Sequence, residues 1–370
     1  MLCLAFAVYE TERLHPSSKP APYGRAMAHS LTLRVRYPLA ASPAPAASRR
    51  LLLRTESDWD ADVEPTAEAG EGTGCDFDLE LEHARPYLYF KPVLRQGDEV
   101  VWSRGENYLA LADGTDGRRV IDVYPYFFDD RGCSACSLHH LASTREQRSH
   151  AVRVFQPPGY AENTLARYPV LYMQDGQNLF FAGEAFGGHH WMIDETLRVL
   201  DAMNLVRKAI IVGVYPQDRM ADYTRPGYEE FGRYLVEDLK PWVDAEHRTL
   251  TGPGDTAVMG SSLGGVVSLF LAWQWPDVFG NAGCLSSTFG FRDDLHERIE
   301  SEPKPPIKIY LDSGWPRDNY EVTRAMRDLL VARGYAEGRD LLYLAFPRAT
   351  HDEASWAMRA HVPFQFFFGG

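Results

Sequence analysis

The feature that most constrains this chain is an alternation of apolar strands and helices that begins near residue 145. Residues 167–173 and 208–215 are continuous apolar runs, which is typical of strands buried on both faces. Segments with a helical pattern lie at 191–203, 228–247 and 263–275. Because strands and helices take turns along the chain, the sequence predicts a mostly parallel sheet covered by helices on both faces. We therefore expect an α/β domain over residues 148–370.

Before residue 128 the apolar and alternating segments of the chain are shorter, and they follow a strand-like pattern. Residues 76–82 alternate between polar and apolar side chains, and Gly and Asp separate further short runs rich in aromatic or branched residues. This spacing predicts an antiparallel β-sandwich over residues 29–128, of an immunoglobulin-like or carbohydrate-module-like kind. Residues 1–28 are expected to form a flexible leader rather than a secretory signal, and residues 129–147 a linker.

Charge and cysteine content exclude several classes of protein. The chain carries 38 basic against 51 acidic residues, and it lacks the concentrated basic segment that nucleic-acid binding requires. No apolar run approaches the roughly 18–20 residues that span a bilayer. Five scattered cysteines do not form a disulfide framework, so we expect a cytoplasmic location. The C-x-x-C pair Cys133 and Cys136 lacks the second pair of a structural zinc site, and we expect no metal and no cofactor.

The most informative motif is Gly260-Ser261-Ser262-Leu263-Gly264, which has the form G-x-S-x-G. An apolar strand leads into it and a long apolar helix leaves it, as in the nucleophile elbow of serine hydrolases. The elbow would present Ser262 on a strained turn, where the helix N-terminus favours developing negative charge. The alternatives are a Gly/Ser-rich helix start without chemistry, or a phosphate-binding turn.

A serine hydroxyl needs an adjacent base, and in this architecture the order along the chain is serine, acid, histidine. Among the histidines after Ser262, His351 is the best placed, because it follows the last predicted strand, 341–346, after a short loop. His296 lies in a charged segment and His361 lies beyond the next helix, so both fit surface or packing positions better.

Two aspartates compete for the role of the acid. Asp318 lies in the loop after the predicted strand 307–311, from which a carboxylate can reach the His351 imidazole and fix its tautomer. Asp312 ends that strand directly and can instead hydrogen-bond the turn at Ser313-Gly314. We prefer Asp318 and keep Asp312 as the alternative.

Five stretches in series carry a family resemblance: Val154–Tyr160, Tyr168–Phe180, Gly260–Gly265, Trp275–Gly280 and His351–Trp356. Together they resemble the esterase family of the α/β-hydrolase superfamily that contains enterochelin esterases, the esterase D group, some feruloyl esterases and mycolyltransferases. The resemblance covers the chain from Arg148 to its C-terminus. It implies an α/β-hydrolase fold with Ser262 as nucleophile, His351 as base and no metal.

An oxyanion hole needs two backbone N–H groups. One is that of Leu263, after the serine, and the loop 174–178 is well placed to supply the other, although Asp175-Gly176 also fits an ordinary tight turn. The resemblance assigns the second amide to Gln177. It also places Trp191 beside the acyl or alcohol pocket, with helix packing as the alternative. Further candidates for substrate binding are Asp175, Arg219 and Trp315.

Residues 87–93 and 101–107 resemble the second half of a starch-binding-type carbohydrate module. Such modules stack an exposed Trp on a sugar ring, which is physically sensible for an aromatic side chain. The resemblance implies sugar contacts from Trp59, Lys91, Trp102 and Asn107. The alternative is that Trp102 packs in the core of the β-sandwich.

The sequence therefore predicts a serine carboxylic-ester hydrolase that acts through an acyl-enzyme with a Ser-His-Asp triad. Two alternatives stay open: an acyltransferase with the same chemistry, and a catalytically inactive glycan-binding protein. The expected partner is a small-molecule or glycan ester, with no nucleic acid and no membrane. Neither the natural ester nor the oligomeric state follows from the sequence.

Overall fold

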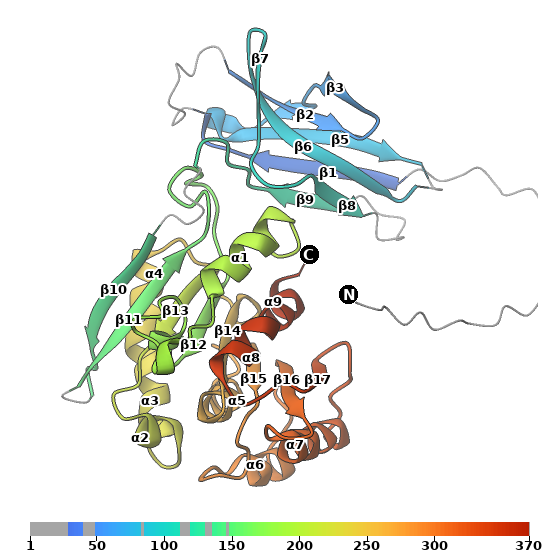
Figure 1. Ribbon diagram of the computed structural model, residues 1–370. Coiled ribbons are helices and arrows are strands. Elements are labelled where there is room, and N and C mark those ends of the chain that lie inside the picture. Colours follow the sequence, from blue (N-terminus) through green and yellow to red (C-terminus); the bar gives the residue numbers. More distant parts are fainter. Residues whose placement is uncertain are drawn as a thin grey trace, which may run out of the picture.

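The computed structural model describes residues 29–39, 49–82, 85–111, 119–129, 135–145 and 148–369 (Figure 1). The expected leader, residues 1–28, lies outside the described residues. Figure 1 shows an N-terminal region built from strands and a larger C-terminal region in which helices surround one sheet.

The N-terminal region contains two sheets, of strand order β4-β5-β1-β9 and β3-β2-β6-β7, with β8 paired to β6. Their strands are β1 (His29–Arg36), β2 (Arg50–Thr55), β3 (Asp58–Val63), β4 (Ala67–Glu68), β5 (Gly74–Leu81), β6 (Tyr87–Gln96), β7 (Glu99–Trp102), β8 (Tyr108–Leu111) and β9 (Arg119–Val123). One 3₁₀ turn, η3 (Gly70–Gly72), precedes β5. Strand β1 pairs antiparallel with β5 but parallel with β9, so this sheet is mixed and not purely antiparallel as expected.

One apolar cluster joins the two N-terminal sheets. Leu33 of β1 and Phe77 of β5 come from one sheet, Leu53 of β2 and Phe90 of β6 from the other, and all four are fully buried. Burying these side chains is the main favourable free-energy term for a region of this size. The region therefore has a core of its own.

The C-terminal sheet has eight strands in the order β10-β11-β13-β12-β14-β15-β16-β17. They are β10 (Ala135–Ala142), β11 (Ser149–Gln156), β12 (Val170–Gln174), β13 (Ile210–Val214), β14 (Thr256–Ser261), β15 (Asn281–Leu285), β16 (Lys308–Trp315) and β17 (Leu341–Pro347). All pairings from β13 to β17 are parallel, whereas β10 and β11 pair antiparallel at one edge. Residues 135–142, expected within a linker, thus form an edge strand, because their backbone hydrogen-bonds with β11.

Helices cover both faces of this sheet, as the alternating sequence pattern predicts. The helices are α1 (Ile193–Ala202), α2 (Arg219–Tyr223), α3 (Tyr228–Tyr234), α4 (Lys240–Glu246), α5 (Leu263–Gln274), α6 (Leu295–Ser301), α7 (Tyr320–Ala332), α8 (Glu353–Arg359) and α9 (His361–Phe368). Shorter turns are η4 (Gly176–Asn178), η5 (Phe186–Gly188), η7 (Pro253–Asp255) and the π-helical η6 (Leu235–Leu239). Alternate residues of β12 enter two different apolar clusters, one containing α3, α5, α6 and α7 and the other α1, α8 and α9.

The N-terminal region docks on the amino ends of the parallel strands. Glu162, between β11 and β12, accepts hydrogen bonds from the Phe127, Phe128 and Asp129 amides at 2.7, 2.9 and 2.8 Å. At the far end of α1, the Glu106 amide donates to the Ala202 carbonyl at 2.6 Å. The carboxyl ends of the strands, where α/β proteins place their sites, lie at the opposite edge.

Candidate active site

Ser262 lies at a sharp turn between β14 and α5. Its backbone has φ 56° and ψ −121°, a conformation that costs a non-glycine residue about 1–3 kcal/mol. The flanking glycines allow this close approach: a Cβ on Gly260 would lie 2.7 Å from the Gly264 carbonyl carbon, and one on Gly265 would lie 2.0 Å from Ser287 Oγ. The strand, the strained serine and the helix thus meet as the G-x-S-x-G motif predicts.

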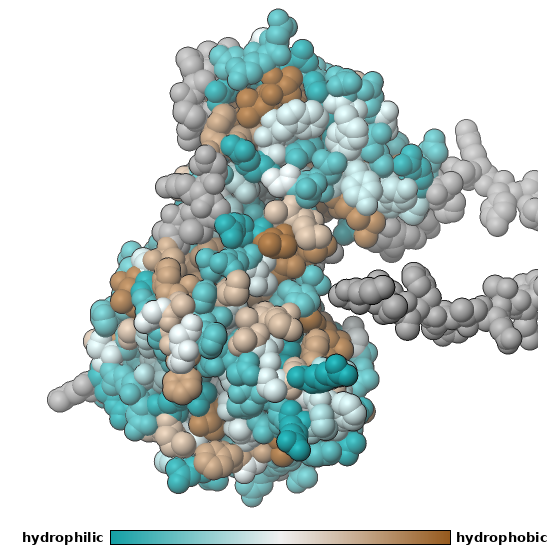
Figure 2. All heavy atoms as spheres, in the orientation of Figure 1, coloured by the Kyte–Doolittle hydropathy of each residue, from teal (hydrophilic) through white to brown (hydrophobic). Residues whose placement is uncertain are grey.

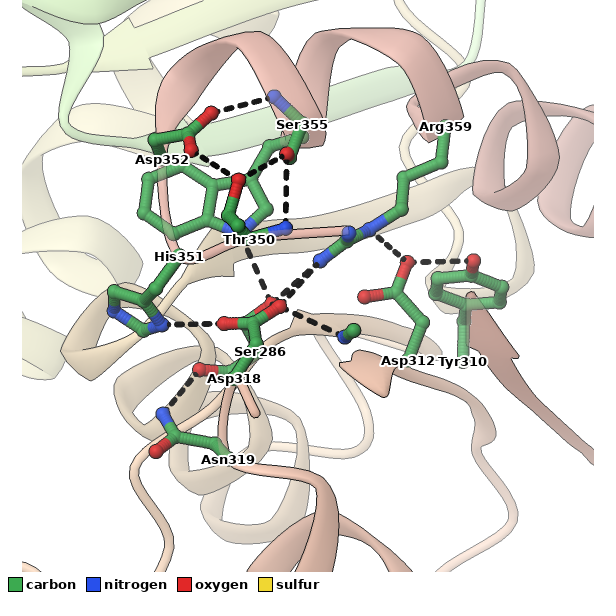
Figure 3. Close-up of polar contacts among 12 residues, drawn as sticks. Ser286, Tyr310, Asp312, Asp318, Asn319, Thr350, His351, Asp352, Ser355 and Arg359 are labelled. Carbon is green, nitrogen blue, oxygen red and sulfur yellow. Dashed lines mark hydrogen bonds and ion pairs between the residues drawn. The ribbon is translucent and has the colours of Figure 1, made fainter. Parts of the chain in front are cut away.

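His351 and Asp318 form a close pair at the same edge of the sheet. His351 Nδ1 lies 2.6 Å from Asp318 Oδ1, with the Asp318 side chain buried and the His351 side chain 38% exposed (Figure 3). Burial acts to raise the pKa of Asp318, but hydrogen bonds from His351, Ser286 and the Gly314 amide outweigh it and lower that pKa. Asp318 is therefore an ionised carboxylate able to orient the imidazole.

Asp312, the alternative acid, makes no hydrogen bond to His351 among the described residues and has other partners. Strand β16 extends to Trp315, which places Asp312 inside the strand instead of at the turn expected at Ser313-Gly314. Its Oδ2 accepts from Arg359 Nε at 3.0 Å and from the Tyr310 hydroxyl at 2.8 Å. Burial raises the pKa of Asp312 to about 6. The structure thus brings Asp318, not Asp312, to His351.

A short path of hydrogen bonds connects the serine turn to the His351 pair. The Ser262 amide donates to the Leu285 carbonyl at 2.9 Å, and the next residue, Ser286, donates to Asp318 Oδ2 at 2.6 Å. Within the described part of the chain, no hydrogen bond joins Ser262 Oγ to His351. Bonds between catalytic groups are often long without substrate and tighten when it binds.

The loop after β12 lies next to this turn. Asp175 is left-handed (φ 55°, ψ 50°), and a Cβ on Gly176 would lie 2.5 Å from the Gly213 carbonyl carbon. Among the hydrogen bonds of the described residues, the Gln177 and Leu263 amides have no acceptor. Two such donors at the ends of β12 and β14 are available to an anion.

Asp175 and Arg219, both candidates for substrate binding, bind each other. Arg219 Nε donates to Asp175 Oδ1 at 2.8 Å and Nη2 donates to Oδ2 at 2.9 Å, a bidentate pair. The Asp175 amide also donates to the Tyr223 hydroxyl at 2.9 Å. These contacts fix the loop that carries Gln177.

The two tryptophan candidates differ in exposure. Trp191 is 3% exposed and packs on Trp356, with ring centroids 5.7 Å apart, and Trp356 in turn packs on His351 at 5.0 Å. Trp191 thus takes the packing role that we kept as its alternative. Trp315 is 48% exposed at the carboxyl end of β16, where it is open to a ligand.

Three residues of this site were not singled out by the sequence: Ser286, Trp356 and Arg359. Trp356 Nε1 donates to Ser286 Oγ at 3.0 Å, and Ser286 carries that contact to Asp318. Trp356 stands in the His351–Trp356 motif, which could have marked it. Ser286 and Arg359 carry no local signal, because their partners lie 32 to 73 residues away along the chain.

In the N-terminal region the structure brings two of the four carbohydrate candidates together. The rings of Trp59 and Trp102 are 6.4 Å apart, and Trp102 is 37% exposed and lies outside the core cluster. Lys91 Nζ donates to the Gly105 carbonyl at 2.6 Å, and Asn107 is exposed. Within the described residues no hydrogen bond or ring contact links Lys91 or Asn107 to the two tryptophans.

A groove of about 970 Å³ runs between α1 and the α8–α9 pair. It is mostly apolar, with Met192, Val199, Met203, Ala354 and Met358 among its lining residues. Figure 2 shows apolar and neutral residues over these helices in the centre of the view. Ser262 and His351 do not line the groove. Ala354, which follows His351 by three residues along the chain, does line it.

No group of three or more His, Cys, Asp or Glu in ranges 29–369, gaps excepted, is arranged to hold a metal ion, and Cys133 lies outside those ranges. None of the helices that the structure describes combines the length and apolarity needed to cross a bilayer.

Residues 143–359, more than half of the chain, match the family model described as "Putative esterase". The chain belongs to this esterase family. Membership classes it with carboxylic ester hydrolases.

Two proteins that this esterase resembles are distant from it in sequence. It is 22% identical over 179 residues to the uncharacterized protein YbbA of Bacillus subtilis, covering 44% of this chain and 66% of YbbA. It is 24% identical over 215 residues to an endo-1,4-beta-xylanase/feruloyl esterase of Xylanibacter ruminicola, covering 56% of this chain and 28% of that protein. The chain thus spans less than two thirds of either relative.

The solved structure of the enterobactin esterase FES from Shigella flexneri has a similar fold, with a TM-score of 0.53 at 15% identity. The superposition covers 91% of this esterase and 92% of FES, so it includes both regions of the chain. At this identity the similarity concerns the fold alone.

Proposed function

We propose that the protein hydrolyses carboxylic esters through an acyl-enzyme formed on Ser262. Support comes chiefly from one observation: the 2.6 Å pair of His351 and Asp318 lies at the same sheet edge as the strained Ser262 turn. Nucleophile, base and orienting carboxylate from three separate strand ends are the parts that this chemistry requires.

In the first half-reaction Ser262 Oγ bonds to the ester carbonyl carbon while His351 Nε2 accepts the hydroxyl proton. The carbonyl oxygen becomes an oxyanion that accepts hydrogen bonds from the Leu263 and Gln177 amides. The carbon–alkoxy bond then breaks, and His351 returns the proton to the leaving alcohol. Asp318 stabilises the transient imidazolium through Nδ1.

In the second half-reaction a water molecule attacks the acyl-enzyme, with His351 Nε2 taking its proton. The bond between Ser262 Oγ and the acyl carbon breaks, the proton returns to Oγ, and the carboxylic acid leaves. If an alcohol takes the place of water, the same steps transfer the acyl group. Product analysis with added glycerol distinguishes hydrolysis from transfer.

The decisive test replaces the nucleophile. Ser262→Ala is expected to abolish turnover of p-nitrophenyl acetate and butyrate and labelling by a fluorophosphonate probe, while Ser261→Ala serves as the matched control on the neighbouring serine. Intact-protein mass spectrometry identifies the acylated residue. Wild-type turnover by the Ser262→Ala protein would reject the mechanism. A panel that includes short-chain, acetyl-glycan and ferulate esters then ranks the substrates, since one relative is named a feruloyl esterase.

For the N-terminal region we infer an immunoglobulin-like sandwich that offers a stacking surface to a saccharide. The adjacent Trp59 and Trp102 rings support this second role, because aromatic faces pack on the apolar face of a sugar. Affinity electrophoresis in amylose or glycogen is expected to retard the protein, and Trp102→Ala to abolish the retardation. Equal migration with and without polysaccharide would reject it.

A further inference from the structure

A buried ion pair lies directly behind the His351–Asp318 pair. Arg359, the last residue of α8, is 2% exposed, and Asp312, inside β16, is fully buried. Removing such ions from water costs several kcal/mol each, and apolar side chains of similar volume often serve stability equally well. A charged pair kept at this place therefore calls for a role other than packing.

The Arg359 guanidinium connects the two carboxylates of the site. Its Nε donates to Asp312 Oδ2 at 3.0 Å, and its Nη2 lies 3.3 Å from Asp318 Oδ2 and also donates to Ser286 Oγ. Figure 3 shows Arg359 pointing from α8 into the space between Asp312 and the Ser286–Asp318 pair. The planar fork of a guanidinium suits this bridging position, whereas an ammonium is a single point of charge.

The two oxygens of Asp318 have separate partners. Oδ1 faces His351, whereas Oδ2 accepts from Ser286 Oγ at 2.6 Å, from the Gly314 amide at 2.7 Å and from Arg359. Ser286 Oγ donates its proton to Asp318 and accepts from Trp356 and Arg359, which uses its full hydrogen-bonding capacity. Every contact on Oδ2 turns Oδ1 toward the imidazole.

We propose that Arg359, held by Asp312, is a positioning residue of the esterase site that keeps Asp318 ionised and oriented toward His351. The proposal rests on the proposed function, because Arg359 acts through Asp318. Two carboxylates and one guanidinium sum to a single negative charge. Arg359 compensates Asp312, and the remaining charge of Asp318 faces the imidazole that becomes positive during acyl transfer.

Loss of Arg359 leaves two carboxylates in one buried space, and such a pair retains a proton. The titratable groups facing Asp318 are His351, Arg359 and Asp312, and those facing Asp312 are Arg359, Tyr310 and Cys284 of β15. Burial already raises the pKa of Asp312 to about 6, so the pair as a whole would hold this proton up to a higher pH, and a proton shared with Asp318 weakens the negative charge that faces His351. The acidic limb of kcat/KM against pH therefore moves upward, and kcat changes more than KM.

The test compares Arg359→Met, Arg359→Lys and the double variant Arg359→Met/Asp312→Asn as full-length proteins, with p-nitrophenyl butyrate as substrate. Arg359→Met is expected to move the acidic limb up by about one pH unit, which lowers kcat/KM about ten-fold on that limb. Arg359→Lys retains the positive charge, so its acidic limb is expected to move less than that of Arg359→Met. The double variant removes the uncompensated carboxylate and is expected to move the limb back toward that of the wild type. Arg324→Met, a half-exposed position on α7, is the matched control.

An unchanged pH profile in Arg359→Met would overturn the proposal, as would a double variant that is more impaired than Arg359→Met, because a packing role predicts additive loss. If circular dichroism shows that Arg359→Met does not fold, the pH profiles of the lysine and double variants are compared with the wild-type profile instead. Ser262→Ala, assayed in parallel, distinguishes failure of the serine mechanism from failure of the role proposed for Arg359. Turnover by Ser262→Ala would reject the serine mechanism itself, whatever the Arg359 variants show.

Discussion

The amino and carboxyl ends of the parallel strands, here called the amino edge and the carboxyl edge of the eight-stranded sheet, differ in two features. These features are backbone strain and hydrogen-bond donors that have no acceptor. In the described loops after the carboxyl ends of the strands, eight non-glycine residues have positive φ: Asp175, Met192, Ser262, Ser286, Arg292, Asp318, Asn319 and Arg348. At the amino edge, Asn204 after α1 is such a residue, and Asn tolerates this conformation well. Strained backbone of this kind persists where the surrounding structure imposes it, and it gathers at functional sites.

Polar groups at the amino edge bind one another instead. Glu162 accepts three backbone amides of the N-terminal region, and the buried Asp201 pairs with Lys208 at 3.4 Å. At the carboxyl edge the Leu263 and Gln177 amides have no acceptor among the described residues. The comparison teaches that the amino edge joins two regions, whereas the carboxyl edge keeps hydrogen-bonding capacity for a ligand.

The largest difference between the edges should appear when one buried carboxylate at each edge is neutralised. Asp318→Asn is expected to lower kcat about 10⁴-fold, because the amide favours the wrong imidazole tautomer and cannot stabilise the imidazolium. Asp201→Asn, at the amino edge, is expected to change kcat less than two-fold (about 0.4 kcal/mol). Steady-state kinetics on p-nitrophenyl butyrate measure both. Comparable losses in the two variants would erase the distinction between the edges.

Glycines at the two edges offer the next contrast. A Cβ on Gly176 would lie 2.5 Å from the Gly213 carbonyl carbon, whereas one on Gly254, at the amino edge, meets nothing within 4 Å. Gly176→Ala is expected to lower the free energy of unfolding by about 3 kcal/mol, and Gly254→Ala to leave it nearly unchanged. Urea denaturation followed by fluorescence gives both values. A stable Gly176→Ala protein would show that the loop carrying Gln177 is not tightly packed.

Contiguous sequence motifs and the order of residues along the chain were enough to predict which residues lie at the carboxyl edge. The strand–serine–helix string around Ser262 is contiguous, and His351 follows the last strand, so both needed only an order along the chain. To choose between Asp318 and Asp312, one must know where β16 ends, and it ends four residues beyond the predicted end. The sequence does not define such a boundary, because it is set by tertiary hydrogen bonds.

Long-range contacts account for what the sequence did not predict. Strand β10 carries mixed polar and apolar side chains and becomes a strand only by pairing with β11. The parallel pairing of β1 with β9 joins segments some ninety residues apart. Arg359 resembles any helical arginine in sequence, and its burial against Asp312 exists only in three dimensions.

Strain at Ser262 can itself be measured. Ser262→Gly is expected to raise the free energy of unfolding by about 1 kcal/mol, because glycine adopts φ 56°, ψ −121° without steric cost but loses more chain entropy on folding. Asn204→Gly, at the amino edge, is expected to give no gain, since it loses the bond from Asn204 Nδ2 to the Glu106 carbonyl. Thermal unfolding of both variants tests the contrast. A destabilised Ser262→Gly protein would contradict the view that function maintains this strain.

A last contrast concerns the groove between α1 and the α8–α9 pair, which has lining residues near both edges. Met358 lines it on α8, near the carboxyl edge, and Met203 lines it beyond the end of α1, near the amino edge. If acyl chains enter from the catalytic edge, Met358→Glu should raise KM for p-nitrophenyl butyrate about five-fold, or about 1 kcal/mol, because a charge replaces apolar contact. KM for the acetate should stay unchanged, as should both values in Met203→Glu, because short chains do not reach that far. Equal effects of Met358→Glu on acetate and butyrate would show that the groove does not receive the acyl chain.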